Sequence, residues 1–228
     1  MTALPAPPSR VQQVYDAIVD DICTGKLTPG TPLRQEQLAE RFSVSRQPVQ
    51  QALLLLRNQG MLRDFGRRGL EVAPVDAEFV RHLYGLRAVL DGYAARSAAG
   101  RLTADQASYG FSLVAAGQRA ETDKNYAGMV AADIDFHRFV TEHSGNPLLV
   151  ESAAVIWRNV QRVMGELLFR GSAPRWVWED HSAIFAAVVA GDADRAEDLA
   201  RRHAEHGEQL ILEALAREHD ADSDTAAS

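Results

Sequence analysis

The chain has 228 residues, of which 46% are hydrophobic and 24% are charged. This length suits one large domain or two small ones, and the composition excludes collagen-like and wholly disordered chains. No apolar run approaches the roughly 20 residues that a membrane span needs, and the N-terminus has neither the charged nor the apolar region of a signal peptide. The only cysteine is Cys23, which excludes a disulfide within the chain. We expect a cytoplasmic protein that does not enter a membrane.

The formal net charge of −7 is distributed unevenly along the chain. Residues 1–75 contain 9 Lys and Arg against 7 Asp and Glu, whereas residues 76–228 contain 15 against 24. Residues 41–70 hold six arginines and one acidic residue, Asp64. A small basic segment on an acidic body is typical of a DNA-binding domain joined to a regulatory domain.

Three helices are predicted in the N-terminal third of the chain. Residues 1–9 are rich in proline and predict a disordered tail. The apolar residues between Val11 and Ile22 recur with the period of a helix. A second helix is predicted from Gln35 to Phe42. The third begins after Ser45, a good N-cap residue, and ends at Gly60.

Two strand-like runs follow the third predicted helix. Residues 61–65 and 70–73 flank the segment Gly66-Arg67-Arg68-Gly69, which predicts a β-hairpin with arginines at its tip. No other stretch of the sequence indicates β structure. Three helices and a basic hairpin predict a winged helix-turn-helix DNA-binding domain over residues 10–74.

In such a domain, the third helix enters the major groove of DNA by its N-terminal end. Arginine suits a bidentate contact to guanine and glutamine suits adenine, whereas arginines on the wing suit phosphate or the minor groove. The alternative is that the polar side chains at the start of this helix are ordinary solvated residues of a surface helix. The basic hairpin directly after the helix favours DNA binding instead. The candidate DNA-binding residues are Arg34, Ser45, Arg46, Gln47, Gln50, Arg67, Arg68 and Gly69.

From Asp76 onward, the sequence predicts only helices. Thr103 and Gln106 resemble a capping box at the start of the second of them. Further helices are expected at about 124–143, 147–170, 175–190 and 192–217, and residues 218–228 predict a disordered tail. The expected fold class is therefore mostly α, with the winged helix-turn-helix followed by an all-helical bundle over residues 75–217.

Four side chains of the predicted bundle have the chemistry of metal ligands. Asp133 and His137 are spaced i, i+4, which places them on one helix face, while His181 and His203 belong to two successive helices. Three imidazoles and a carboxylate suit a divalent transition metal such as zinc, nickel or manganese. By spacing alone, the alternative of a hydrogen-bonded structural cluster remains open.

The N-terminal motifs resemble those of the GntR superfamily of bacterial transcription regulators. Its pattern is close to G-x-L-x-P-G, L-A, V-S-R-T-P-V-R-E-A-L and G-L. The matching segments here are Gly25-Lys-Leu-Thr-Pro-Gly30, Leu38-Ala39, Val44 to Leu53 and Gly60-Met61-Leu62. Three positions depart from the pattern: Gln35 stands for the usual Glu, Gln47 for Thr, and Gln50 for an Arg that commonly contacts DNA. The family's usual operator sequence is therefore not assumed.

Residues 76–217 resemble the all-helical effector domain of the FadR-type (FCD) subfamily. The matching marks are Arg87 with Asp91, Asp133 to His137, Gly145-Asn146-Pro147-Leu148, Asp180-His181, Gly191-Asp192 and His203. The resemblance implies a divalent metal held by Asp133, His137, His181 and His203, and a small carboxylate as effector. It also implies a role for Arg87 in holding that effector, with Arg158 and Asn159 as further candidates. The alternative for Arg87 is a helix-surface ion pair with Asp91.

Together, these features predict a ligand-responsive transcription regulator, more specifically a repressor, that binds operator DNA as a homodimer. Two-fold symmetric half-sites require such a dimer. The alternatives are a metal-dependent enzyme that uses the Asp and His residues, and a structural DNA-binding protein without a ligand. An enzyme is not expected, because no further base or nucleophile motif accompanies the four candidate ligands.

Overall fold

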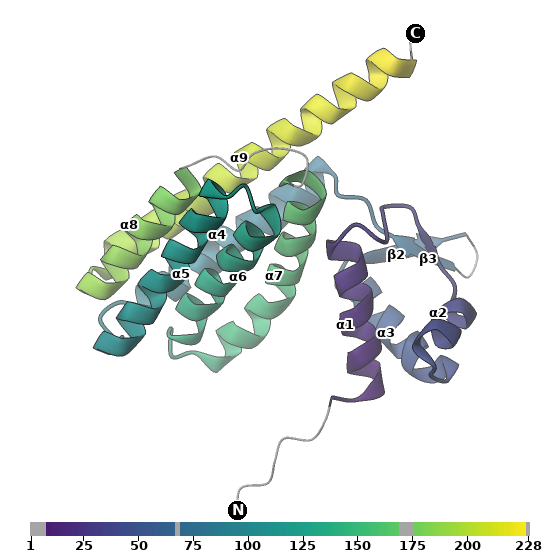
Figure 1. The fold of residues 1–228 in the computed structure, drawn as a ribbon, viewed down its shortest axis with the longest axis horizontal. Coiled ribbons are helices and arrows are strands. Elements are labelled where there is room, and N and C mark those ends of the chain that lie inside the picture. Colours follow the sequence, from purple (N-terminus) through teal and green to yellow (C-terminus); the bar gives the residue numbers. More distant parts are fainter. Residues whose placement is uncertain (1–7, 67–68, 169–175, 227–228) are drawn as a thin grey trace, which may run out of the picture. The chain divides into compact units, whose positions relative to one another are not determined.

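The computed structural model describes residues 8–66, 69–168 and 176–226. The chain forms two compact units, Met1–Val75 and Asp76–Ser228 (Figure 1). The predicted tail at residues 1–9 lies almost wholly outside the described residues, and so do the two wing arginines, Arg67 and Arg68.

The first unit combines three helices with a small antiparallel sheet (Figure 1). Its elements are α1 (Arg10–Cys23), β1 (Pro32–Leu33), α2 (Gln35–Phe42), α3 (Arg46–Asn58), β2 (Leu62–Phe65) and β3 (Gly69–Val72). The strand order is β1-β3-β2, and Leu62 of β2 pairs with Val72 of β3. The predicted hairpin is thus confirmed. The expectation of no other β structure is wrong, because β1 pairs with β3, and a two-residue strand is too short to show an alternating pattern.

Local chemistry accounts for the two helices of the helix-turn-helix. Ser43 ends α2 in the left-handed conformation with φ 52°, which allows a tight turn into α3. Ser45 occupies the N-cap of α3, but its side chain makes no capping hydrogen bond. The inner face of α3 is then buried through Val49, Leu53 and other residues of the unit's core. This packing leaves the polar start of α3 in solvent.

The second unit is a helical bundle (Figure 1). Its helices are α4 (Ala77–Ala98), α5 (Ala104–Thr122), α6 (Tyr126–Glu142), α7 (Pro147–Leu168), α8 (Trp176–Ala190) and α9 (Ala193–Ala226). The capping box predicted for α5 is confirmed, since Thr103 and Gln106 exchange both hydrogen bonds. Helix α9 continues to Ala226, across residues 218–226 that the sequence analysis placed in a disordered tail. The predicted fold class is confirmed.

Close packing of α8 on α5 holds α8 in place within the bundle. A Cβ atom built on Gly117 of α5 would lie 2.0 Å from the Trp178 ring, and one on Gly110 would lie 2.0 Å from Phe185. Only glycine therefore allows these two aromatic rings of α8 to lie directly on α5. Phe185 in turn belongs to a core that includes Phe136 and Phe139 of α6. This aromatic packing holds α8, which carries His181, against α6, which carries Asp133.

Candidate metal centre and DNA-binding surface

The polar start of α3 presents the predicted base-reading side chains. Ser45, Arg46, Gln47 and Gln50 are all exposed. The guanidinium of Arg46 lies 3.3 Å from the carboxylate of Glu36 on α2, and both side chains are about two-thirds exposed or more. Such an exposed pair stabilises the fold by at most about 1 kcal/mol, so it leaves Arg46 able to exchange partners.

A hollow of about 800 Å³ lies between the helix-turn-helix and the wing, and Arg34, Gln50 and Gly69 all line it. The structure thus brings together three predicted residues that are far apart in sequence. Arg57 lines the same hollow and pairs with Asp64 at 3.4 Å. The sequence analysis did not include Arg57 among the DNA-binding candidates, although its basic charge on the third helix was the available signal.

The four candidate metal ligands converge inside the second unit. Asp133 and His137 come from α6, His181 from α8 and His203 from α9, and one ligand atom of each lies within 4.8 Å of the others. The Nε2 atom of His181 is 3.1 Å from Nε2 of both His137 and His203, and 3.3 Å from Oδ1 of Asp133. All four side chains are at most 4% exposed.

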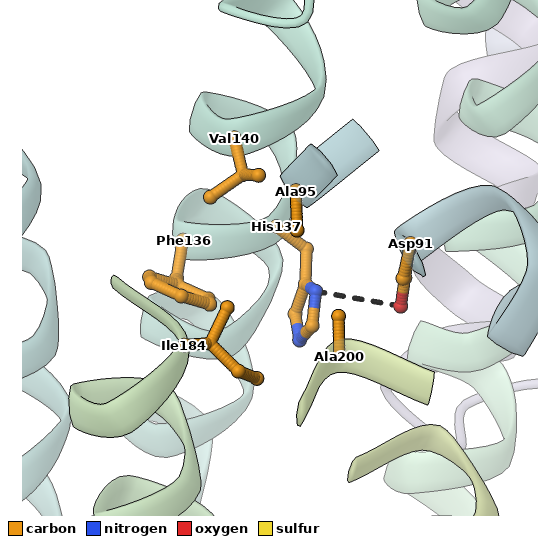
Figure 2. A pocket seen from close by; sticks show the side chains of 7 residues that line it. All are labelled: Asp91, Ala95, Phe136, His137, Val140, Ile184 and Ala200. Atoms are coloured by element: carbon orange, nitrogen blue, oxygen red, sulfur yellow. Dashed lines mark ion pairs between the residues drawn. The ribbon is translucent and has the colours of Figure 1, made fainter. Parts of the chain in front are cut away.

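Two further carboxylates lie near the Nδ1 atoms of the imidazole rings, on the side away from the cluster. Oδ2 of Asp91 faces Nδ1 of His137 at 3.5 Å (Figure 2), and Oδ2 of Asp180 lies 3.3 Å from Nδ1 of His203. The contact of Asp180 with His203 is a hydrogen bond. A carboxylate accepts, so Nδ1 of His203 carries the proton and the lone pair of its Nε2 is directed at the cluster. The sequence analysis named Asp180 only among the marks of the FCD resemblance and missed this contact between α8 and α9.

Arg87 lies at the edge of the cluster. Its Nη2 atom is 3.0 Å from Nε2 of His137 and 3.5 Å from Nε2 of His203, while its Nε donates to Asp91 at 3.0 Å. Its guanidinium also lies over the ring of Trp157, 4.6 Å from the centroid. The predicted i, i+4 pair with Asp91 therefore exists, but it is buried rather than a surface pair.

Burial controls the protonation of the cluster. It raises the pKa of Asp91 and of Asp133 to about 6, because the charged carboxylates are removed from water. Burial also lowers the pKa of His137, His181 and His203 well below the usual value, and the charge of Arg87 lowers each further. The imidazoles are therefore neutral at pH 7, which is the protonation state of a metal ligand.

The arrangement fits a divalent transition metal. At the usual metal–nitrogen distance of about 2.0–2.1 Å, neighbouring ligand atoms lie roughly 3.0–3.4 Å apart, close to the spacing around Nε2 of His181. Oδ2 of Asp133 is buried with no hydrogen-bond partner among the described residues, so this oxygen is available to a cation as well. The cluster can hold a metal, which would supply a fixed positive charge there. Its ligand set does not choose among zinc, nickel and manganese.

The predicted effector residues lie in different surroundings. The hollow beside His137 is lined by Asp91, Phe136 and four apolar residues (Figure 2). Its volume of about 10 Å³ is enough for one water molecule. Arg87 lies at the cluster, whereas Arg158 lines a groove between α6 and α7. Asn159 is 3% exposed, and its amide donates to the carbonyl of Val155 at 3.2 Å.

A winged helix-turn-helix followed by a helical bundle with a buried Asp and His cluster defines a two-domain DNA-binding regulator. Residues 10–72 match the family of bacterial regulatory proteins of the gntR type, and residues 82–206 match the FCD domain. The chain belongs to the GntR family of transcription regulators and carries the FCD type of C-terminal domain.

The curated relatives are transcription regulators as well, in agreement with the expectation that the protein is not an enzyme. The chain is 29% identical over 200 residues to the uncharacterized HTH-type transcriptional regulator YdfH of Escherichia coli O6:H1, covering 87% of each chain. It is 28% identical to the HTH-type transcriptional repressor RspR of Escherichia coli K12, covering 84% of each chain. It is 27% identical to the probable D-xylose utilization operon transcriptional repressor of Paenarthrobacter nicotinovorans, again covering 84% of each.

Solved structures share the fold. Escherichia coli McbR/YncC superposes with a TM-score of 0.79 at 20% identity, over 91% of this chain and 99% of that one. A putative GntR regulator from Rhodococcus superposes with a TM-score of 0.76 at 23% identity, over the same shares of the two chains. Within the described residues, no helix has the length and apolar character that crossing a membrane requires.

Proposed function

We propose that this protein is a metal-containing, ligand-responsive repressor that binds operator DNA as a homodimer. The observation that carries this proposal is the convergence of Asp133, His137, His181 and His203 in a chain that also has a winged helix-turn-helix. The names of two relatives support the repressor role, since both are described as repressors. The metal is a divalent transition ion such as zinc, nickel or manganese.

The operator is read by the start of α3 and by the wing. In this proposal, Arg46, Gln47 and Gln50 contact base edges and Ser45 contacts the DNA backbone. Arg34, Arg67, Arg68 and Gly69 complete the candidate surface. Because Gln50 is neutral where the family pattern has Arg, the operator differs at the base pair that this position faces.

The effector is a small carboxylate, and Arg87, Arg158 and Asn159 are the residues proposed to respond to it. A ligand that binds one arrangement of the protein more tightly shifts the population toward that arrangement. Binding of the ligand then changes the affinity of the protein for the operator by a certain factor. Binding of DNA changes the affinity of the protein for the ligand by the same factor. The FCD resemblance supports this mode of control.

An apolar stripe on α4 supports the homodimer. Leu86, Val89 and Tyr93 are spaced i, i+3, i+7 and are 46–48% exposed, although the opposite face of α4 is buried in the bundle. The exposed apolar stripe suits burial against a second copy of the same chain.

Two measurements test the proposed function. Purified protein is analysed for bound metal, and its affinity for labelled DNA from upstream of its own coding region is compared with that for scrambled DNA at two salt concentrations. We expect about one transition metal ion per chain and tight binding that depends on sequence. Absence of metal would support the structural-cluster alternative, and equal affinity for both DNAs at both salt concentrations would contradict the assignment of a sequence-reading head.

A further inference from the structure

The third helix of the first unit, α3, carries only two charged residues. They are Arg46 in its first turn and Arg57 near its end, and all the residues between them are neutral. Gln47 and Gln50, the other predicted base readers on this helix, offer hydrogen-bonding groups without a charge. Any side-chain charge that α3 presents to DNA therefore comes from these two arginines.

Each of the two arginines faces a carboxylate from a neighbouring element. Nη1 of Arg46 lies 3.3 Å from Oε1 of Glu36 at the start of α2, and Nη1 of Arg57 lies 3.4 Å from Oδ1 of Asp64 on β2. Glu36, Arg57 and Asp64 line the hollow between the helix-turn-helix and the wing, together with Gln50. The surface assigned to DNA therefore contains two carboxylates, and each offsets one cation of the reading helix.

A carboxylate on such a surface affects the two kinds of DNA contact unequally. A phosphate is negatively charged, so it is repelled by a carboxylate that lies close to it. The O6 and N7 atoms of guanine are uncharged acceptors, and an arginine that already has a carboxylate partner still donates to them. A paired arginine is therefore a weaker phosphate ligand than a free arginine, but it keeps its ability to read a base.

The contact between Arg46 and Glu36 leaves one edge of the guanidinium for a base. It uses Nη1, whereas Nε and Nη2 form a separate, side-on edge of the same planar group. Guanine accepts hydrogen bonds from two such nitrogens through O6 and N7. Both side chains are about two-thirds exposed or more, so the pair lies open to a base edge.

We propose that Glu36 is a specificity-determining residue of the DNA-binding surface, because it holds the guanidinium of Arg46 for a guanine and opposes its contact with phosphate. The proposal deepens the proposed function and rests on the assignment of Arg46 as a base reader. Loss of the Glu36 carboxylate frees Arg46 to turn toward the DNA backbone. Binding to DNA of any sequence is then strengthened, while the guanine of the operator is read less strictly.

Asp64 has the same charge as Glu36 but a different position. It pairs with Arg57, at the other end of α3 from the first turn that enters the major groove. Asp64→Asn is therefore the matched control for Glu36→Gln, since both remove one negative charge from the lining of the same hollow. We expect the control to strengthen binding to all sequences alike and to leave base preference unchanged.

Selection of bound duplexes from a random pool by the full chain tests base preference. We expect the wild type to select a guanine at one position, Glu36→Gln to select it about tenfold less strongly, and Asp64→Asn to select it as strongly as the wild type. In an Arg46→Ala background, Glu36→Gln is expected to change nothing further, because Glu36 acts through Arg46. Both acidic side chains are about two-thirds exposed or more, so neither substitution is expected to unfold the unit.

Fluorescence anisotropy with a scrambled duplex, over a series of salt concentrations, measures the contact with phosphate. We expect Glu36→Gln to bind this duplex several-fold more tightly than the wild type. The slope of log affinity against log salt concentration is expected to steepen by about 0.9, since Arg46 neutralises one further phosphate. An unchanged affinity with an unchanged slope would show that Glu36 does not restrain Arg46, and would overturn the proposal.

The outcomes separate failure of this proposal from failure of the proposed function. If the wild type selects no sequence, the DNA-reading assignment fails and the role of Glu36 fails with it. If Glu36→Gln selects the wild-type sequence equally strongly, the protein is a sequence reader but Glu36 does not determine its specificity. Equal relaxation in Glu36→Gln and Asp64→Asn means that only the net charge of the surface matters, which also overturns the proposal.

Discussion

Asp180 of α8 lies 3.3 Å from Nδ1 of His203 of α9, and this contact decides which nitrogen of the ring faces the cluster. Asp91 lies 3.5 Å from Nδ1 of His137, at ion-pair distance. The Asp180 carboxylate keeps the proton on Nδ1 of His203 and leaves Nε2 as a lone-pair donor. The candidate metal centre therefore includes more than its four ligands, because Asp180 sets the tautomer of one of them.

Loss of the Asp180 carboxylate is expected to weaken the metal site. We expect Asp180→Asn to lower zinc affinity about 10- to 100-fold, because the amide no longer fixes the tautomer of His203. Competition with a chelator of known affinity measures this. Glu179→Gln is the matched control, since Glu179 is the exposed neighbour. Equal zinc affinities of the two variants would show that Asp180 does not orient His203.

Metal binding is expected to stabilise the fold. A ligand that binds only the folded state adds about 2.7 kcal/mol at a free concentration of 100 times its dissociation constant. We expect zinc to raise the melting temperature of the wild type and to have no such effect on His181→Ala, which loses the central ligand. Calorimetric melting with and without zinc measures this. A hydrogen-bonded structural cluster predicts instead that the variant is less stable and that zinc stabilises neither protein.

Metal affinity is expected to depend on pH through Asp133. Burial raises the pKa of this carboxyl to about 6, and it has to be ionised to bind a cation. The pKa of His137 is lowered well below its usual value by burial, so protons compete for the imidazoles only at lower pH. Affinity should thus be constant above about pH 7 and fall about tenfold per unit below about pH 6.

Chelator competition between about pH 5 and pH 8 measures this dependence. A decline that begins near the ordinary histidine pKa of about 6.5 and is several times steeper would mean that the three imidazoles titrate as exposed histidines. That outcome would contradict the burial of the cluster rather than the identity of its ligands.

Arg46 and Arg57 are expected to contribute differently to operator binding. We expect Arg46→Ala to cost about 1–3 kcal/mol on the operator and to relax base preference, because Arg46 lies at the start of the reading helix. Arg57 lines the hollow beside the wing, so Arg57→Ala should weaken all sequences alike and reduce the salt dependence. Fluorescence anisotropy with operator and scrambled duplexes measures both. An equal loss on both duplexes for Arg46→Ala would reject its role as a base reader.

Dimerisation is expected to depend on the exposed stripe of α4. We expect Val89→Lys to raise the dimer dissociation constant at least about tenfold, because each chain would bury a lysine in the apolar contact. Sedimentation velocity at several protein concentrations measures this. Leu148→Lys is the control, since Leu148 is 70% exposed at the start of α7, away from the stripe. If only the control variant dissociates, the interface lies elsewhere.

The sequence alone determined the helices and most of the sheet, because those signals are local. The helix from Gln35 to Phe42 coincides with α2, and the capping box at Thr103 and Gln106 depends on residues three apart. Spacing also placed Asp133 and His137 on one helix face. The family motifs are contiguous segments of the chain, so they too are readable without a structure.

Only the tertiary structure decided which distant side chains meet. It brought Asp180 behind His203, placed Trp157 between the groove and His137, and separated Arg158 from Arg87. It also paired the two residues of β1 with β3, which no local pattern indicated. These contacts depend on how helices pack and turn relative to one another, and packing is set by side chains far apart in sequence. Local periodicity predicts which face of a helix is buried, whereas the elements that pack against that face follow only from the fold.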